Sequence, residues 1–254
     1  AASGEPVIKL KNLYFRYAKN SDDVLRGLSL EIEEGRLHCL LGGNGSGKST
    51  TLKAICGIIK PQSGKVKLAD NYRAAMVPQN PQALFTEISC EEEVLEGMCY
   101  QKLEIEEKVR RTEEMLKLME IEHLRKANPY DLSGGEQQRL ALAKVMVSNP
   151  DILLLDEPTK GLDPFFKQTL GRILRSLCKE NKTIFMVSHD IEFCAEFGDR
   201  CSMFFDGEIA TSGSAKEFFS GNNFYTTVEN KLTRKWCEGI ITGEEARSWI
   251  RSLL

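Results

Sequence analysis

The chain has 254 residues, a formal net charge of −3 and 28% charged residues, which is the balance of an ordinary folded protein. It lacks the basic character of most nucleic-acid-binding domains, so the sequence predicts no nucleic-acid partner. No apolar run approaches the roughly 18 residues that cross a bilayer, and no basic flank followed by an apolar core stands at the N-terminus. We therefore expect neither a membrane span nor a secretory signal in these residues.

Eight cysteines are scattered along the chain without a Cys-x-x-Cys pair, a pattern unlike that of zinc sites. Several of them lie in apolar stretches, which favours buried free thiols in a reducing compartment over a set of disulfides. The chain begins without Met, and residues 1–4 resemble a remnant of cloning or a piece of a longer chain.

Short apolar strands and a helix alternate along the N-terminal part of the chain. Strands are predicted over residues 7–10, 28–32, 37–41, 66–68 and 74–77, and a helix over residues 49–58. Residues 62–64 are expected to form a turn before the fourth of these strands.

The middle of the chain is acidic, with 11 acidic and 5 basic residues between positions 91 and 122. Apolar residues recur at helical spacing from Ile105 to Met119, and several acidic residues stand four positions before a basic one. This pattern favours a solvated helical face over an acidic binding tail.

Strand-like runs return at residues 152–155, 183–187 and 200–205, and a hairpin turn at residues 206–207 leads into a strand at 208–211. A helix over about residues 165–178 separates the first two strands. This strand–helix–strand order predicts a parallel sheet. Beyond residue 219 a polar stretch leads into a mixed helical tail.

The first motif that carries chemistry is GGNGSGKST at residues 42–50. It satisfies G-x-x-x-x-G-K-[ST], follows an apolar strand and opens a helix, so its backbone N–H groups are expected to cradle phosphate oxygens. The lysine would neutralise the β- and γ-phosphates of a nucleotide, and the serine hydroxyl would ligate Mg²⁺. A glycine-rich turn that only caps a helix is the alternative. The predicted nucleotide contacts in this segment are Asn44, Gly45, Gly47, Lys48, Ser49 and Thr50.

The second motif is ILLLDEP at residues 152–158, a buried strand from whose carboxyl end two carboxylates emerge. Open α/β sheets bind ligands at that edge. Asp156 fits a carboxylate that holds Mg²⁺, mostly through water, and Glu157 fits the base that orients and polarises an attacking water. An acidic turn that caps the next helix is the alternative.

The third motif is LSGGE at residues 132–136. Ser133 is expected to cap a helix, with Glu136 three residues later closing a capping box. Two glycines at a helix N-terminus also form a second anion site, about ninety residues from the first in sequence.

Taken together, these segments resemble the ATP-binding-cassette (ABC) ATPases, of which LSGGE is the defining sequence, and the resemblance covers about residues 5–220. It implies an α/β fold: a P-loop NTPase core of the ABC ATPase type with an antiparallel β portion at the N-terminus. An α-helical subdomain would be inserted at about residues 85–148. Residues 221–254 would form a helical C-terminal extension, either a cap on the core or a dimer-stabilising segment.

Four further positions match the family in order, and their roles are implied by the resemblance. Tyr17 stands where an aromatic ring stacks on adenine, and Gln79 where a glutamine contacts Mg²⁺ and water. Asp163 lies in a loop that crosses to the opposite protomer, and His189 matches a histidine that contacts the γ-phosphate. Lys160 is an unusual residue for its position. The expected catalytic residues are thus Glu157, His189, Lys48 and Gln79, and the expected Mg²⁺ ligands are Ser49, Gln79 and Asp156.

In this family two chains sandwich two ATP molecules head to tail, so Ser133 and Gly135 are expected to contact the γ-phosphate held by Lys48 of a partner. A homodimer or a heterodimer with a second ABC ATPase is expected. Rival interpretations are a soluble ABC ATPase that acts on ribosomes or DNA, and a nucleotide-binding module that regulates a partner without hydrolysis. Neither the charge balance nor the complete set of catalytic positions favours them.

A finer resemblance joins the segments VPQNPQALF (77–85), NPYD (128–131) and NFYTT (223–227) to the ATPases of energy-coupling-factor transporters. That group imports vitamins and transition-metal ions, and some members fuse two ATPase units, which suits a chain that starts without Met. The resemblance implies an ATP-hydrolysing subunit on the cytoplasmic face of the cell membrane. Its partners would be a transmembrane coupling subunit and a substrate-binding membrane protein.

Overall fold

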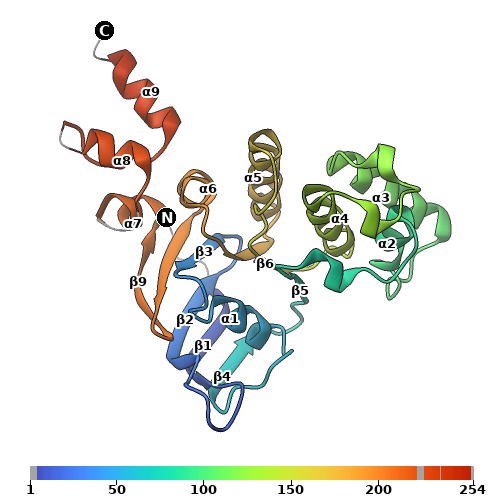
Figure 1. The fold of residues 1–254 in the computed structure, drawn as a ribbon, viewed down its shortest axis with the longest axis horizontal. Coiled ribbons are helices and arrows are strands. Elements are labelled where there is room, and N and C mark those ends of the chain that lie inside the picture. Colours follow the sequence, from blue (N-terminus) through green and yellow to red (C-terminus); the bar gives the residue numbers. More distant parts are fainter. Residues whose placement is uncertain (1–4, 222–225, 235, 253–254) are drawn as a thin grey trace.

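The computed structural model describes residues 5–221, 226–234 and 236–252, which fold into two β-sheets with helices packed around the larger one (Figure 1). The smaller sheet is antiparallel, with strand order β2-β1-β4. Its strands are β1 (Pro6–Phe15), β2 (Leu25–Glu33) and β4 (Ser63–Leu68). The turn predicted over residues 62–64 extends too far, because β4 already begins at Ser63, which pairs with Tyr14 across an irregularity in β1.

The larger sheet has the strand order β5-β6-β7-β3-β8-β9, parallel from β5 to β8 and closed by an antiparallel hairpin. The strands β3, β6 and β7 are buried along their whole length. Strands covered on both faces read as continuous apolar runs, which explains why these segments do not alternate. The bounds are β3 (Leu37–Gly42), β5 (Ala74–Val77), β6 (Ile152–Asp156), β7 (Thr183–Val187), β8 (Arg200–Phe205) and β9 (Glu208–Ser214).

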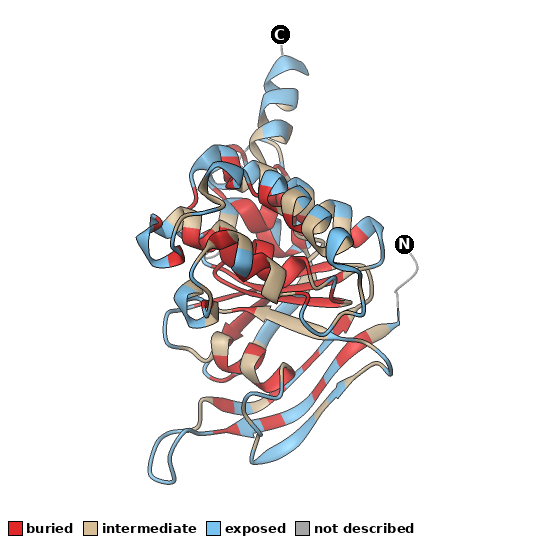
Figure 2. Ribbon diagram, turned by 90° about the vertical axis from the view of Figure 1, so that its right-hand side faces the viewer, coloured by how far each residue is buried: buried red, intermediate tan, exposed pale blue. Residues whose placement is uncertain are grey.

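Each face of the larger sheet contributes to a separate hydrophobic core. Ile152 and Leu154 of β6 pack toward the smaller sheet and α1 (Lys48–Ile55), whereas Leu153 and Leu155 pack toward α5 (Pro164–Lys179) and α6 (Ile191–Phe197). Figure 2 shows the buried residues concentrated in this sheet and in the helix faces against it. The helix α1 ends before residue 58, where its prediction placed the end, since the chain turns at Gly57.

The helices α2 (Cys90–Glu96), α3 (Ile105–Leu118) and α4 (Gly134–Met146) lie between β5 and β6 in the chain and form a separate lobe (Figure 1). Short 3₁₀ turns at Pro81–Leu84, Glu122–Leu124 and Pro129–Asp131 connect them. The acidic stretch forms a solvated face on α3, as expected, where Glu107 pairs with Arg110 and Arg111 at 2.8 and 2.6 Å.

A buried ion pair fastens this lobe internally. Lys144 Nζ on α4 lies 2.5 Å from Glu93 Oε2 on α2. The other carboxylate oxygen of Glu93 accepts the backbone N–H groups of Thr86 and Glu87 at 2.6 and 2.7 Å. One carboxylate therefore joins α2, α4 and the segment that arrives from β5.

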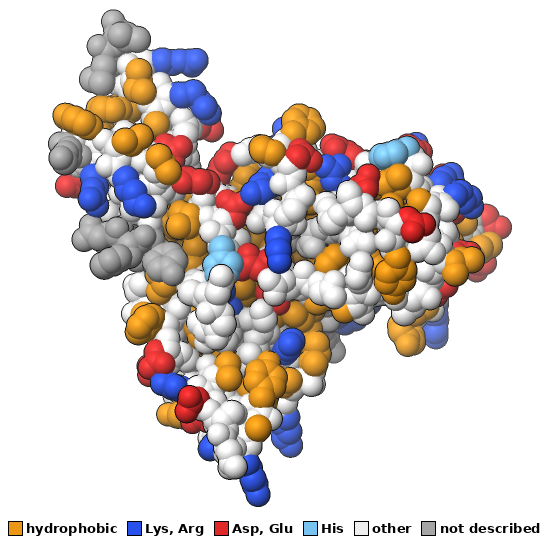
Figure 3. All heavy atoms as spheres, in the orientation of Figure 1, with side chains coloured by type: hydrophobic (Ala, Val, Ile, Leu, Met, Phe, Trp, Pro, Cys, Tyr) orange, Lys and Arg blue, Asp and Glu red, His pale blue; other side chains and the backbone are white. Residues whose placement is uncertain are grey.

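The C-terminal part contains α7 (Ala215–Gly221), α8 (Val228–Thr233) and α9 (Gly243–Ser252). The Val228 N–H donates to Glu192 Oε1 on α6 at 3.1 Å, which attaches α8 to the core. Apolar side chains are exposed along this part (Figure 3), among them Leu232 and Ile250. Residues 223–225 of the segment used for the finer resemblance lie outside the described residues.

All eight cysteines are free thiols, and five of them are buried. Within the described ranges, no helix combines the length and the apolar character that a bilayer span requires.

Candidate functional site

The phosphate loop joins β3 to α1 at the carboxyl edge of the larger sheet. Gly47 closes the loop at φ 115°, and a Cβ there would lie 2.8 Å from Val24 Cγ1, so the position requires glycine. Lys48 is buried, and its ammonium donates to the carbonyl oxygens of Gly42 and Gly43 at 3.0 and 2.7 Å. The loop thus holds a buried cation whose hydrogen bonds go to backbone carbonyls of the loop itself. A phosphate group bound in the loop would supply the anion that this cation lacks.

Two oxygen ligands meet behind this loop. Ser49 Oγ donates to Asp156 Oδ1 at 3.0 Å, which joins the first turn of α1 to the end of β6. Burial raises the pKa of Asp156, while the Ser49 hydroxyl and nearby lysines oppose that shift. A hydroxyl and a carboxylate are the hard oxygen donors that Mg²⁺ prefers, so this pair fits the ion that the sequence implies.

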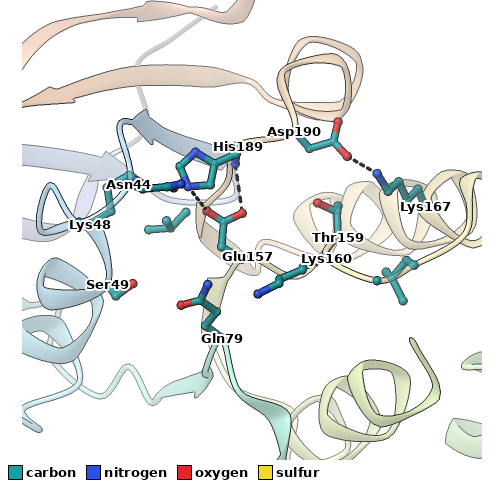
Figure 4. A pocket seen from close by; sticks show the side chains of 14 residues that line it. Asn44, Lys48, Ser49, Gln79, Glu157, Thr159, Lys160, Lys167, His189 and Asp190 are labelled. Carbon is teal, nitrogen blue, oxygen red and sulfur yellow. Dashed lines mark hydrogen bonds and ion pairs between the residues drawn. The ribbon is translucent and has the colours of Figure 1, made fainter. Parts of the chain in front are cut away.

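Glu157 follows directly and has a left-handed backbone, at φ 55°. Its side chain is buried, and Oε2 accepts the backbone N–H of His189 at 3.1 Å (Figure 4). The other oxygen, Oε1, lies 3.0 Å from His189 Nε2 but has no aligned hydrogen-bond donor among the described residues. Burial raises the pKa of Glu157. A buried carboxylate with one oxygen held and the other without an aligned donor suits a group that accepts a proton.

His189 stands at the end of β7, beside Glu157. Burial, and then the Lys48 charge, lower the pKa of His189 below its ordinary value of 6.5. The imidazole is therefore neutral at pH 7, with one ring nitrogen available as a donor.

Lys48, Ser49, Glu157 and His189 face one cavity of about 680 Å³ (Figure 4), whereas Asp156 lies behind its lining. The parallel strands β3, β6 and β7 end at the same edge, which brings together residues more than a hundred positions apart. The predicted residues that line it are Asn44, Gly45, Lys48, Ser49, Gln79, Glu157 and His189.

An adjoining cavity of about 200 Å³ holds the predicted adenine position. Tyr17 is 59% exposed, and its hydroxyl lies 3.0 Å from Thr50 Oγ1. Gly47 and Thr50 line this second space together with Tyr17. The base contact itself stays a prediction.

Neither Ser133 nor Gly135 lines the phosphate-loop cavity. Ser133 caps α4, because its Oγ accepts the Glu136 backbone N–H at 3.4 Å. The Ser133 hydroxyl in turn donates to Glu136 Oε2 at 2.6 Å. The backbone at Gly135 touches the loop after Glu157, since a Cβ there would lie 2.8 Å from Gly161 O. The N-terminus of α4 therefore faces a neighbouring cavity of about 500 Å³, which Gly134 lines.

The carboxylate of Asp163 is engaged within its own chain. It caps α5 by accepting the Phe166 N–H at 2.9 Å, and it pairs with Arg139 of α4 at 2.6 Å. These contacts lower the pKa of Asp163, the Phe166 N–H first. The Arg139 guanidinium also lies 3.8 Å from the centre of the Phe166 ring. A contact of Asp163 with nucleotide stays a prediction.

Sequence reasoning missed three polar residues that line the main cavity: Thr159, Lys167 and Asp190. Lys167 Nζ lies 2.6 Å from Asp190 Oδ2, and Asp190 caps α6. The capping position of Asp190 after a strand was a signal that could have found it, whereas Lys167 is one of many lysines on a helix.

The sequence profile of the family described as "ABC transporter" matches residues 25–160. A Bacillus cereus protein named as an ABC transporter ATP-binding protein is 41% identical over 252 residues, which cover 95% of this chain and 45% of that protein. The energy-coupling factor transporter ATP-binding protein EcfA1 of Ligilactobacillus salivarius is 33% identical over 270 residues, covering 96% of this chain and 95% of that protein.

Among solved structures, cbiO1 from Clostridium perfringens, described as part of the ABC transporter complex cbiONQ, superposes with a TM-score of 0.74. It shares 31% sequence identity, and the match covers 91% of this chain and 96% of that one. The chain spans less than half the length of the Bacillus cereus relative. These matches confirm the predicted fold class.

Proposed function

This chain belongs to the ABC transporter family, and on that basis we propose that it is the ATP-binding and ATP-hydrolysing subunit of an energy-coupling-factor importer. The observation that carries the proposal is the convergence of Lys48, Glu157 and His189 on one cavity. A phosphate-loop lysine, a buried carboxylate and a neutral imidazole suit phosphoryl transfer to water. We assign the ABC ATPase domain to residues 5–220, its helical subdomain to about 85–148 and the C-terminal extension to 221–254.

Nucleotide binding would begin at the phosphate loop. The Lys48 ammonium, which donates to two backbone carbonyls, would exchange them for the more strongly charged β- and γ-phosphate oxygens. The exposed Tyr17 ring would stack on adenine. Ser49 and Asp156 would hold Mg²⁺ together with Gln79. When bound, that ion neutralises charge on the phosphate oxygens.

Hydrolysis would proceed by in-line attack of water on the γ-phosphorus as the bond to the oxygen of ADP breaks. Glu157 Oε1, which lacks an aligned donor, would orient the water and accept its proton. A raised pKa makes Glu157 a better proton acceptor than an exposed glutamate. The neutral His189 would donate to a γ-phosphate oxygen, and Lys48 would stabilise the developing charge.

Two chains would be needed for a complete site. Ser133 and Gly135 lie at the N-terminus of α4, where backbone N–H groups and the helix dipole attract anions. Neither residue lines the phosphate-loop cavity of its own chain, which suits contact with ATP on a partner. We propose a homodimer or a heterodimer with a second ABC ATPase.

We propose that the dimer acts at the cytoplasmic face of the cell membrane. It would dock on a transmembrane coupling subunit that works with a substrate-binding membrane protein. The name of the Ligilactobacillus salivarius relative and the cbiONQ complex of the Clostridium perfringens relative support this assignment. The imported substrate would be a vitamin or a transition-metal ion, selected by the membrane components.

The test is steady-state ATP hydrolysis by the purified chain, measured against protein concentration with and without Mg²⁺. The proposal expects Mg²⁺-dependent turnover whose rate per chain rises with concentration. Absence of turnover under all conditions would leave only a nucleotide-binding module. Co-expression with the membrane proteins of adjoining reading frames should yield a complex, whereas co-purification with ribosomes or DNA would contradict the importer assignment.

A further inference from the structure

Lys160 is a cation at the nucleotide cavity that the proposed mechanism leaves unused. It stands three residues after Glu157, and its backbone N–H donates to the Glu157 carbonyl at 3.1 Å, which closes a tight turn. Figure 4 shows the Lys160 side chain extending beside Glu157 toward Gln79. The side chain therefore lies on the face of the cavity where the γ-phosphate end of a nucleotide would lie.

Among the described residues, the ammonium of Lys160 lacks the polar partners that the other two lysines of the cavity have. Lys167 lines the same cavity but pairs with Asp190 at 2.6 Å, and Lys48 donates to two backbone carbonyls. No carboxylate of the described residues lies within 4.0 Å of Lys160 Nζ, although its charge lowers the pKa of Glu157. The ammonium is thus available to an anionic ligand.

The backbone that carries Lys160 is well supported. The turn after Glu157 touches the N-terminus of α4 through Gly161 and Gly135, and Leu162 is buried in the core. Lys160 itself is exposed and lines both the main cavity and the neighbouring one. The turn fixes the position of the Lys160 backbone, and the flexible four-carbon side chain lets the ammonium move only within a short distance of it.

We propose that Lys160 is a second cationic contact for the γ-phosphate of the ATP bound to its own chain. The inference rests on the proposed function. Lys48 lies at the phosphate-loop side of the cavity and Lys160 at the Glu157 side, so the two ammonium groups would meet the γ-phosphate from different directions. ADP, which ends at the β-phosphate, would lack the Lys160 contact.

Binding to a monomer tests this contact without turnover. In a Ser133→Arg background, designed to prevent dimer-dependent hydrolysis, calorimetry would measure the affinities for Mg-ATP and Mg-ADP. Lys160→Met should weaken Mg-ATP binding about tenfold and leave Mg-ADP binding within about twofold, as loss of one charged hydrogen bond predicts. Lys160→Arg should restore the affinity for Mg-ATP. Lys179→Met, which removes an exposed charge at the far end of α5, should change neither affinity.

Turnover of the otherwise wild-type chain provides a second measurement. Lys160→Met should lower kcat about tenfold to a hundredfold, because the contact strengthens as charge develops on the γ-phosphate oxygens.

Equal weakening of Mg-ATP and Mg-ADP would overturn the inference, and so would an unchanged affinity for Mg-ATP in the monomer. Failure of Lys160→Arg to restore binding would also contradict it. These outcomes leave the proposed function standing, provided that the wild-type chain hydrolyses ATP. A wild-type chain that binds no ATP overturns both.

Discussion

Glu157 at the end of β6 accepts a hydrogen bond from the backbone N–H of His189 at the end of β7, at 3.1 Å. One side chain thus links the carboxyl ends of two adjacent parallel strands. The link fixes one carboxylate oxygen, while the other, Oε1, is buried 3.0 Å from His189 Nε2. The orientation of the proposed base is therefore set by the sheet itself.

Glu157→Gln should keep nucleotide binding and abolish most turnover. The amide keeps the size of the side chain and its contact with the His189 N–H, but it cannot accept a proton from water. Loss of a general base typically costs about 10²–10⁴-fold, so a decrease of that size in kcat is expected. ATP should also hold the variant as a closed dimer, which size-exclusion chromatography with ATP would detect. Turnover equal to that of the wild type would remove Glu157 from the role of base.

Lys48→Ala should abolish measurable binding of Mg-ATP. The variant loses the cation that faces the phosphates, while the loop keeps the glycines that define its path. Titration calorimetry is the direct measurement, and circular dichroism at the same concentration would establish that the variant is folded. Affinity within about twofold of the wild type would refute the assignment of the phosphate loop.

Ser133→Arg should leave Mg-ATP binding by a monomer intact and block hydrolysis that depends on two chains. The bulky cation replaces the cap of α4 at the surface that a partner's nucleotide would contact. The loss of the cap should also lower the free energy of unfolding by about 1 kcal/mol. If hydrolysis survives the change and is independent of protein concentration, the two-chain site is wrong.

The free energy of unfolding should decrease as the pH is lowered, because of His38. This histidine is buried, its Nε2 lies 2.7 Å from Ser202 Oγ, and burial, then Arg200, lower its pKa to about 3. Above pH 6.5 the side chain is neutral in both states. As the pH falls from 6.5 toward 3, only the unfolded chain takes up the proton, so the native state loses about 1.4 kcal/mol per pH unit.

Urea unfolding at pH 7 and pH 5 would measure this dependence. His38→Gln should reduce the loss of stability between the two pH values by about 2 kcal/mol, since the variant has no titrating side chain at position 38. His123→Gln, at an exposed position, is the matched control and should retain the wild-type dependence. Parallel pH dependence in all three proteins would contradict the assignment to His38.

Lys144→Met should destabilise the helical lobe strongly. It leaves the fully buried Glu93 without its cation, a change that typically costs about 3–5 kcal/mol of unfolding free energy. The control is Lys126→Met, which removes an exposed lysine that also lies 2.5 Å from a carboxylate, that of Glu91. Glu91 would keep its ion pair with Arg125 at 2.5 Å, so removal of the exposed Lys126 should cost only about 0–1 kcal/mol, and equal losses in urea unfolding would contradict the argument.

The central strands were predictable from the sequence because both of their faces are covered. Predicted and observed bounds coincide for the buried strand β7, and also for β5, an edge strand whose residues are mostly half-buried. The short helices α2 and α6 were not predicted, since seven residues are too few to show a helical period.

The sequence likewise predicted one part of the candidate site and not another. Local motifs identified the phosphate loop and the two carboxylates, because their chemistry depends on neighbouring residues. Contacts such as Lys167 with Asp190, or Arg139 with Asp163, join residues 23 or 24 positions apart through tertiary packing. No local pattern marks such pairs.

The close approach of Gly135 to the Gly161 carbonyl has a consequence for a dimer. Within each chain, the turn that follows Glu157 is in direct contact with the N-terminus of α4, which is the surface proposed to contact the partner's nucleotide. Movement of the turn when its own cavity fills would therefore displace the surface that completes the other cavity. Occupancy of one site would change the affinity of the second, so ATP saturation curves of the dimer should depart from a simple hyperbola.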